Sequence, residues 1–119
     1  MREERARDEA WQARTADLRQ ALATSDVPFV VALAHGSMRV ELFAPRGVDT
    51  QSPHPQDELY LVSRGTSRFV NDGVETLCQA GDVLFVKAGV EHRFVDFSAD
   101  FETWVIFWGP DGGECRSDG

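Results

Sequence analysis

Histidine and carboxylate side chains occur in two short segments near the middle of the chain, and together they could hold a metal ion. The first segment offers His54 and Glu58, four residues apart, at the head of the apolar run Leu59–Val62. The second delivers His92 just after a glycine turn at Gly89. Neutral imidazole and carboxylate groups are good ligands for first-row divalent metals. These three groups therefore predict a site for one divalent transition metal.

Strand periodicity gives these side chains a common direction. Residues two and four apart on a strand point to the same face. If the segment around His54 is extended, His54 and Glu58 look into the same interior, and Tyr60 and Val62 continue the inward row. Tyr60 is the candidate catalytic residue, because its hydroxyl could donate a proton or a hydrogen bond to a substrate. An inward tyrosine is as often simply part of a core.

Short β-branched and aromatic runs, separated by turn residues, fill the chain from Pro28 onward. They predict strands at Phe29–Ala34, Ser37–Phe43, Glu58–Ser63, Ser67–Asn71, Val74–Gln79, Asp82–Lys87, His92–Phe97 and Phe101–Trp108. The Asn71-Asp72-Gly73 step is typical of a tight hairpin. Eight short strands without intervening helices indicate an antiparallel sandwich or barrel.

The remaining residues divide simply. Met1–Thr24 is rich in helix-forming residues, contains no Pro or Gly, and places Trp11, Leu18 and Leu22 on one narrow stripe. We therefore expect a helix at 1–24, a β-barrel domain at 25–110 and a polar flexible tail at 111–119.

Aromatic, acidic and histidine side chains elsewhere receive ordinary structural roles. We expect the interior of the barrel to be filled by Phe69, Phe85, Phe94, Trp104 and Phe107. We expect Asp49, Asp57 and Asp96 at the surface or in turns, His35 in a turn, and Cys78 in the core.

Composition excludes several classes of function. With 119 residues the chain forms one domain. Its net charge of −8 disfavours nucleic acid as a partner. No apolar run approaches the length of about 20 residues that crosses a bilayer, and no signal-type segment opens the chain, so we expect a cytoplasmic protein without membrane contact. Cys78 and Cys115 form no CxxC motif.

The two ligand-bearing segments resemble the motifs of the cupin family, over about Val40 to Gly109. In the first motif, Glu58 is followed by six residues and Gly65, and His54 occupies the position of the second histidine. The second motif maps onto Gly81, Lys87, Gly89, His92 and Asp96. More closely, Pro53–Tyr60 is similar to small bacterial cupins with a PH-x-QDE-x-Y signature. The resemblance implies an all-β double-stranded β-helix, or jelly roll.

Three positions depart from the family pattern. Ser52 replaces the first histidine, Lys87 a proline, and Asp96 the final asparagine. Two histidines and one carboxylate remain, the ligand set of the facial triad in non-haem iron oxygenases. Gln51 or a water could complete the set, Gln51 if a bulge at Ser52–Pro53 corrects its direction. Lys87 is either a charge at the barrel mouth or a solvated strand end.

The resemblance implies a metal-dependent enzyme that acts on a small organic molecule inside the barrel. Iron would favour a dioxygenase, whereas zinc, manganese or nickel would favour isomerase, lyase or hydrolytic chemistry. The alternative is a non-catalytic module that binds or senses a small molecule, and a third reading is a structural barrel with a vestigial site. Because a small barrel has sheet edges to cover, we expect a homodimer.

Overall fold

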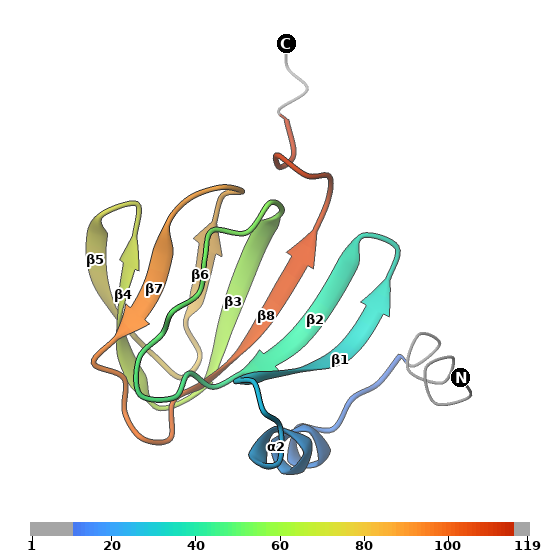
Figure 1. The fold of residues 1–119 in the computed structure, drawn as a ribbon, viewed down its shortest axis with the longest axis vertical. Helices are drawn as coiled ribbons and strands as arrows, with labels where there is room; N and C mark the ends of the chain where they lie inside the picture. The colour runs from blue at the N-terminus through green and yellow to red at the C-terminus, as the bar shows by residue number, and fades with distance from the viewer. Residues whose placement is uncertain (1–10, 116–119) are drawn as a thin grey trace.

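Two antiparallel sheets facing each other make up the molecule, in a computed structural model that describes residues 11–115 (Figure 1). The five-stranded sheet has the order β1-β2-β8-β3-β6, and the three-stranded sheet has the order β5-β4-β7. The strands are β1 (Phe29–His35), β2 (Met38–Phe43), β3 (Asp57–Arg64), β4 (Thr66–Asn71), β5 (Val74–Gln79), β6 (Val83–Val86), β7 (His92–Val95) and β8 (Glu102–Trp108). This arrangement confirms the jelly-roll class.

All eight predicted strands are present, and local turn chemistry explains their ends. The β4–β5 hairpin turns at Asp72 and Gly73, whose φ angles of 53° and 81° match the expected tight turn. At the end of β3, Gly65 has a φ of 82°, and a Cβ there would come within 2.8 Å of the Phe101 Cα. Only glycine fits that close approach of two chain segments.

Alternation along β3 separates the core from the outer surface. Glu58, Tyr60 and Val62 are 1%, 0% and 1% exposed and face the space between the sheets. Tyr60 and Val62 belong to the hydrophobic core, whose other members are Phe43, Phe69, Cys78, Val86, Phe94, Phe101, Val105 and Phe107. Phe69, Phe94, Phe107 and Cys78 therefore lie where the sequence predicts.

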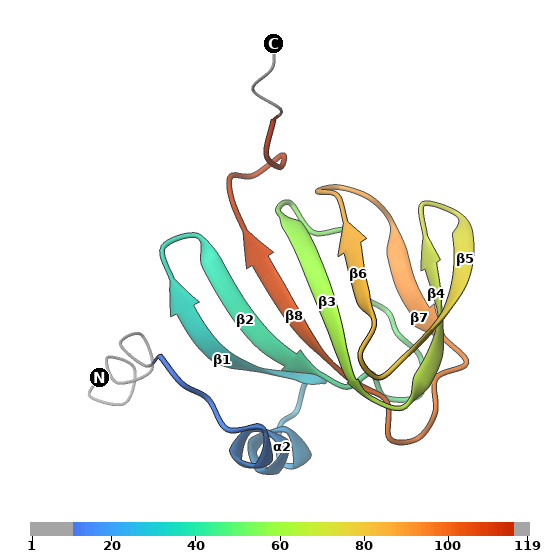
Figure 2. The same cartoon turned by 180° about the vertical axis from the view of Figure 1, so that it is seen from behind.

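Phe85 and Trp104 do not fill the barrel, contrary to the prediction. Phe85 pairs with Leu59 and Trp104 pairs with Leu61, and these β3 positions belong to the outward row. Phe85 is accordingly 49% exposed. Figure 2 shows this outer face of the five-stranded sheet, over which no described element lies at β3 and β6.

The helix α2 (Thr15–Ala23) is shorter than the predicted helix at 1–24. Residues 11–14 are not helical and Trp11 is 92% exposed, while residues 1–10 lie outside the described part of the chain. Leu22 alone of the predicted stripe is fully buried. Within residues 11–115, no helix has the length and apolar character needed to span a membrane.

A two-pronged ion pair attaches α2 to the barrel. The Arg19 guanidinium donates from Nε and Nη2 to the two Glu102 oxygens at 2.7 and 2.9 Å. Ser63 donates a further hydrogen bond to Glu102 at 2.7 Å. Burial would raise the pKa of Glu102, but the bonds from Arg19 and Ser63 outweigh it and lower that pKa. The carboxylate is therefore the form that binds the helix.

We predict that Glu102→Gln lowers stability at pH 7 and that its effect disappears in acid. The pKa of Glu102 in the folded protein lies below its unfolded value of about 4.3. The contribution of this carboxylate to the free energy of unfolding is therefore complete above about pH 4.3 and is lost as the pH falls through the folded-state pKa. Urea unfolding of both proteins at pH 7, 5 and 3.5, followed by tryptophan fluorescence, measures the difference. A difference that stays constant with pH contradicts the assignment.

Candidate functional site

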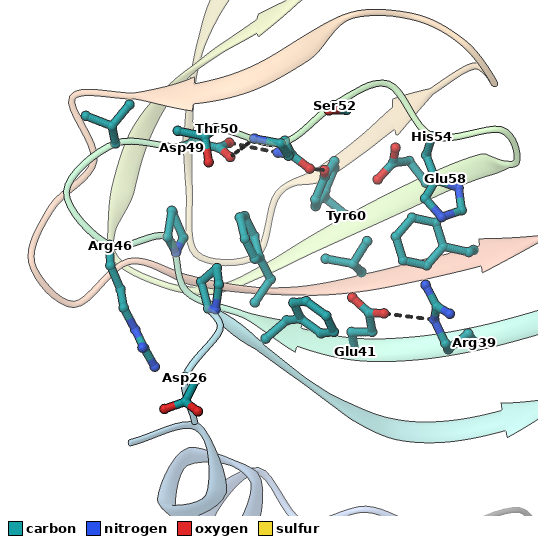
Figure 3. Close-up of a pocket in the computed structure, with 18 residues that line it drawn as sticks. Asp26, Arg39, Glu41, Arg46, Asp49, Thr50, Ser52, His54, Glu58 and Tyr60 are labelled. Carbon is teal, nitrogen blue, oxygen red and sulfur yellow. Dashed lines mark hydrogen bonds and ion pairs between the residues drawn. The ribbon is translucent and has the colours of Figure 1, made fainter. Parts of the chain in front are cut away.

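A cavity of about 500 Å³ opens between the inner face of the five-stranded sheet and the segment 44–56 (Figure 3). One part of its wall is apolar and includes Phe29, Phe43, Val105 and Phe107. Another part is polar and includes Arg39, Glu41, Gln51, His54, Glu58 and Tyr60. A concave site with an apolar wall and a few converging polar groups is typical of small-molecule sites.

Asp49 holds the segment 44–56 beside β7. Its Oδ2 accepts a hydrogen bond from the Phe94 backbone N–H at 2.8 Å, and it also accepts bonds from the Gln51 backbone and side chain. Asp49 was predicted at the surface or in a turn; it is only 6% exposed and lies on irregular backbone, so the surface alternative is wrong. The irregular segment runs beside β7 (Figure 1), and its residues form one wall of the cavity.

Glu58 lines the cavity and contacts His92, which lies behind it and is not itself a lining residue. Oε1 of Glu58 lies 3.0 Å from Nε2 of His92, and both side chains are almost fully buried. The His92 Nδ1–H donates to the Val90 carbonyl at 2.8 Å, which leaves Nε2 as the atom directed at Glu58. The lone pairs of Glu58 Oε1 and His92 Nε2 would repel each other unless a proton or a metal ion lay between these two atoms.

Protonation meets this requirement when no metal is bound. Burial alone would lower the pKa of His92, but the hydrogen bonds to Glu58 and to the Val90 carbonyl outweigh it, so the pKa is raised. Oε2 of Glu58 is buried and has no hydrogen-bond partner among the described residues. An unpartnered buried carboxylate oxygen is costly and is well placed to accept a cation.

Tyr60 lies beside this pair on the same strand as Glu58. Its hydroxyl is 3.1 Å from His92 Nε2 and donates to Gln51 Oε1 at 3.2 Å. Burial, followed by the negative charge of Glu58, raises the pKa of Tyr60 well above its ordinary value. The phenol is therefore a hydrogen-bond donor at neutral pH and not a base.

His54 lies at the same cavity but approaches it differently from the prediction. It precedes β3, on irregular backbone, and its ring stacks on Phe107 with centroids 3.9 Å apart. Burial lowers the pKa of His54, so the imidazole is neutral at pH 7. The Gln56 backbone N–H donates to its Nδ1 at 3.2 Å. Ligation through Nε2 requires the ring proton to move to Nδ1 and this bond to be lost.

Gln51 also lines the cavity, although its amide groups already have partners. Its Oε1 accepts from Tyr60, and its Nε2 donates to Asp49 at 2.7 Å. The amide thus links the segment 44–56 to the inner row of β3. Gln51 orients Tyr60 in this arrangement.

Asp57 connects three segments near the site. It begins β3 and is 6% exposed, contrary to the predicted position at the surface or in a turn. Its oxygens accept hydrogen bonds from the backbone N–H groups of Glu114 at 2.9 Å and of Ala88 at 3.0 Å. These two bonds lower the pKa of Asp57.

Lys87 is exposed and does not line the cavity, which agrees with the prediction of a solvated strand end and not with a charge at the barrel mouth. His35 and Asp96 are also exposed.

Arg39 and Glu41 are cavity residues that the sequence analysis missed. They are two apart on β2, and the register with Phe107 and Val105 of β8 places them on the inner face. Arg39 Nε donates to Glu41 Oε2 at 2.8 Å. Burial raises the pKa of Glu41, and Arg39 opposes that shift. The alternation Arg39-Val40-Glu41-Leu42 does indicate that Arg39 and Glu41 share one face of the strand. Because charged residues usually face solvent, this alternation favours the outer face and not the cavity.

The donor set fits a divalent metal in part. Two ligands at right angles around a metal, with bonds of about 2.1 Å, are about 3 Å apart, and Glu58 Oε1 and His92 Nε2 have this separation. The His92 Nδ1–H bond to a carbonyl is the usual orienting contact of a metal-binding histidine. Within residues 11–115, however, no three His, Cys, Asp or Glu side chains converge as a metal site. Of the three predicted ligands, His54 is the one whose placement would have to change for a metal to be held.

We predict that Tyr60→Phe lowers the free energy of unfolding by about 1–2 kcal/mol, because it removes a buried hydroxyl that links Gln51 to His92. Urea unfolding in the presence of a chelator measures the change without any metal contribution. A variant as stable as the parent protein would show that these two contacts are not formed in solution.

Comparisons with known proteins agree with this architecture. A family model described as Cupin domain matches residues 39–106. An uncharacterized protein of Streptomyces coelicolor is 36% identical over 101 residues, which cover 82% of this chain and 95% of that protein. Both matches include the two segments that carry Glu58 and His92.

Solved structures with the same fold are more distant in sequence. A cupin-2 domain protein of Shewanella frigidimarina aligns with a TM-score of 0.64 and 18% identity, over 81% of this chain and 94% of that chain. A putative mannose-6-phosphate isomerase of Ralstonia eutropha aligns with a TM-score of 0.56 and 22% identity, over 73% of this chain and 94% of that chain. These similarities concern the fold alone.

Proposed function

The chain belongs to the cupin family, and we propose that it is a metal-dependent enzyme acting on a small organic molecule in the cavity. His54, Glu58 and His92 would hold one divalent transition metal, namely iron, zinc, manganese or nickel. The observation that carries the proposal is the buried contact of Glu58 Oε1 with His92 Nε2, beside an unpartnered carboxylate oxygen of Glu58, a residue that lines a cavity of about 500 Å³.

Each protein residue has a defined role in this proposal. A divalent metal supplies Lewis-acid polarisation of a bound oxygen, and iron additionally supplies oxygen chemistry. Tyr60 is kept protonated by its raised pKa, and its single O–H proton would turn from Gln51 Oε1 to a substrate oxygen when a substrate binds. The apolar wall around Phe43 and Phe107 excludes water from the reacting group.

We predict that the purified protein holds about one equivalent of a transition metal and that His92→Ala abolishes this binding. Elemental analysis after growth in metal-supplemented medium measures the content. His35→Ala is the matched control, because His35 is an exposed histidine at the end of β1 and does not line the cavity. It should retain the metal of the parent protein.

Metal identity then selects the chemistry. Iron leads to oxygen-consumption assays, and zinc, manganese or nickel leads to isomerase, lyase and hydrolase substrates. A protein without metal, or equal metal loss in His92→Ala and His35→Ala, would refute the proposed ligand set.

A non-catalytic binding module is the second candidate. The position of His54 favours it, because this imidazole stacks on Phe107 and uses Nδ1 in a local hydrogen bond. In that case, the cavity binds small molecules but turns none over. Ligand binding that does not change between the metal-loaded and chelator-treated protein supports this candidate.

We also propose that the protein is a homodimer formed through the outer face of the five-stranded sheet. Leu61, Val83 and Phe85 lie on adjacent strands of that face and are 40%, 60% and 49% exposed. On a chain of net charge −8, an uncharged apolar face is the part of the surface where two copies repel each other least. Large exposed apolar patches mark interaction surfaces.

Sedimentation at micromolar concentration should therefore give a dimer, and Phe85→Glu should give a monomer because it places a charge in the buried contact. Leu77→Glu is the control, since Leu77 is an exposed apolar residue of β5 in the other sheet, at 72% exposure. A monomeric parent protein, or a dimer in both variants, would contradict this interface.

A further inference from the structure

We propose that Arg39 binds the carboxylate of the substrate, so that the cavity takes a small organic carboxylate with one negative charge. This inference rests on the proposed function, because it assigns the substrate class of the same cavity. Arg39 is not among the ligand residues, and it reaches the cavity from β2 on the wall below His54 and Glu58 (Figure 3).

The Arg39 guanidinium is fixed in place while much of its hydrogen-bonding capacity stays free. Nε is used by Glu41 at 2.8 Å, and Cζ lies 5.2 Å from the centroid of the Phe107 ring. Neither Nη atom has a partner among the described residues, and the side chain is 46% exposed. A guanidinium held at Nε and open at both Nη groups can form a hydrogen-bonded pair with a carboxylate.

Arg46, the other cation that lines the cavity, has no comparable freedom. Its Nη1 and Nη2 donate to the backbone carbonyls of Ser25 and Leu22 at 2.9 and 2.7 Å, so it anchors the end of α2. Among the described cavity residues, Arg39 is therefore the cation with donors available to a ligand.

Phe107 connects the Arg39 position to the proposed metal residues. Its ring is stacked by His54 at 3.9 Å and contacted by the Arg39 guanidinium at 5.2 Å. A molecule whose carboxylate pairs with Arg39 therefore has its remaining atoms beside His54 and Glu58. Its apolar part would lie against Phe29, Phe43 and Val105.

Charge favours a monoanion over a dianion such as a phosphate ester. A divalent metal with Glu58 leaves one positive charge in the cavity, and Arg39 with Glu41 is neutral as a pair. The amide donors on Asp49 stabilise its charge without cancelling it. The Asp49 carboxylate already offsets the positive charge that would be left at the metal centre, so each negative charge on a ligand adds repulsion from Glu41 and Asp49, and a dianion is repelled more than a monoanion.

Benzoate is a suitable probe, since it joins one carboxylate to one apolar ring, and benzamide is its neutral counterpart of the same shape. Calorimetric titration of the metal-loaded protein should show benzoate binding about 10-fold more tightly than benzamide. Arg39→Gln should remove this preference by weakening benzoate binding about 10-fold.

Arg68→Gln is the matched control for Arg39→Gln. Arg68 is also a strand arginine with carboxylate partners, Glu75 and Asp96, and its side chain is 49% exposed, but it lies outside the cavity. It should bind benzoate like the parent protein. Glu41→Gln should act in the opposite direction and tighten benzoate binding, because it removes a competing carboxylate from Arg39.

Equal binding of benzoate and benzamide would overturn the proposal, as would equal benzoate affinities in Arg39→Gln and Arg68→Gln. If Arg39→Gln fails to fold, the direction of the Glu41→Gln effect decides, and unchanged or weaker benzoate binding refutes the proposal. Elemental analysis of the same samples separates this result from the proposed function. A metal-loaded protein without carboxylate preference refutes the Arg39 role alone, whereas Arg39-dependent binding without metal refutes the ligand set alone.

Discussion

The contact between the Glu58 carboxylate and the His92 imidazole joins the two sheets, and the cavity is organised around it. Glu58 lies on β3, between β8 and β6, whereas His92 begins β7 in the opposite sheet. Burying a carboxylate is costly unless an opposite charge accompanies it, and removing one member of such a pair leaves the other uncompensated. The two sheets must therefore close in one register, and that register also sets the positions of Tyr60 and Phe107.

Two further buried carboxylates keep irregular backbone in place around this contact. Asp49 accepts the Phe94 N–H and thereby fixes the segment 44–56 beside β7. Asp57 accepts the Ala88 and Glu114 N–H groups and thereby joins the start of β3 to the turn before His92 and to the C-terminal segment. Buried backbone donors need partners. These side chains supply them where strand pairing has ended, so the cavity wall is ordered without being part of a sheet.

The cavity combines two kinds of polar group on one apolar floor. Glu58, His92 and Tyr60 form the inner group, in which every polar atom except Glu58 Oε2 has a partner. Arg39 and Glu41 form the second group, which is more open to solvent. Phe107 contacts both Arg39, in the second group, and His54. A ligand paired with Arg39 would therefore lie beside His54.

Strand periodicity in the sequence was sufficient to predict the eight strands, an antiparallel sandwich or barrel, and the inward row Glu58, Tyr60 and Val62, because each depends on residues close in the chain. The jelly-roll class followed from the resemblance of the two motifs to the cupin family. The same rule failed at Phe85 and Trp104, because hydrophobicity does not show which face of a strand is turned inward. Asp49 and Asp57 were predicted at the surface or in turns because the backbone amides that bind them in the interior, those of Phe94 and Ala88, are 45 and 31 positions away. Only the tertiary structure brought Glu58 to His92, and only the register of β2 with β8 turned Arg39 and Glu41 into the cavity, since contacts between distant segments depend on how the sheets pair and close.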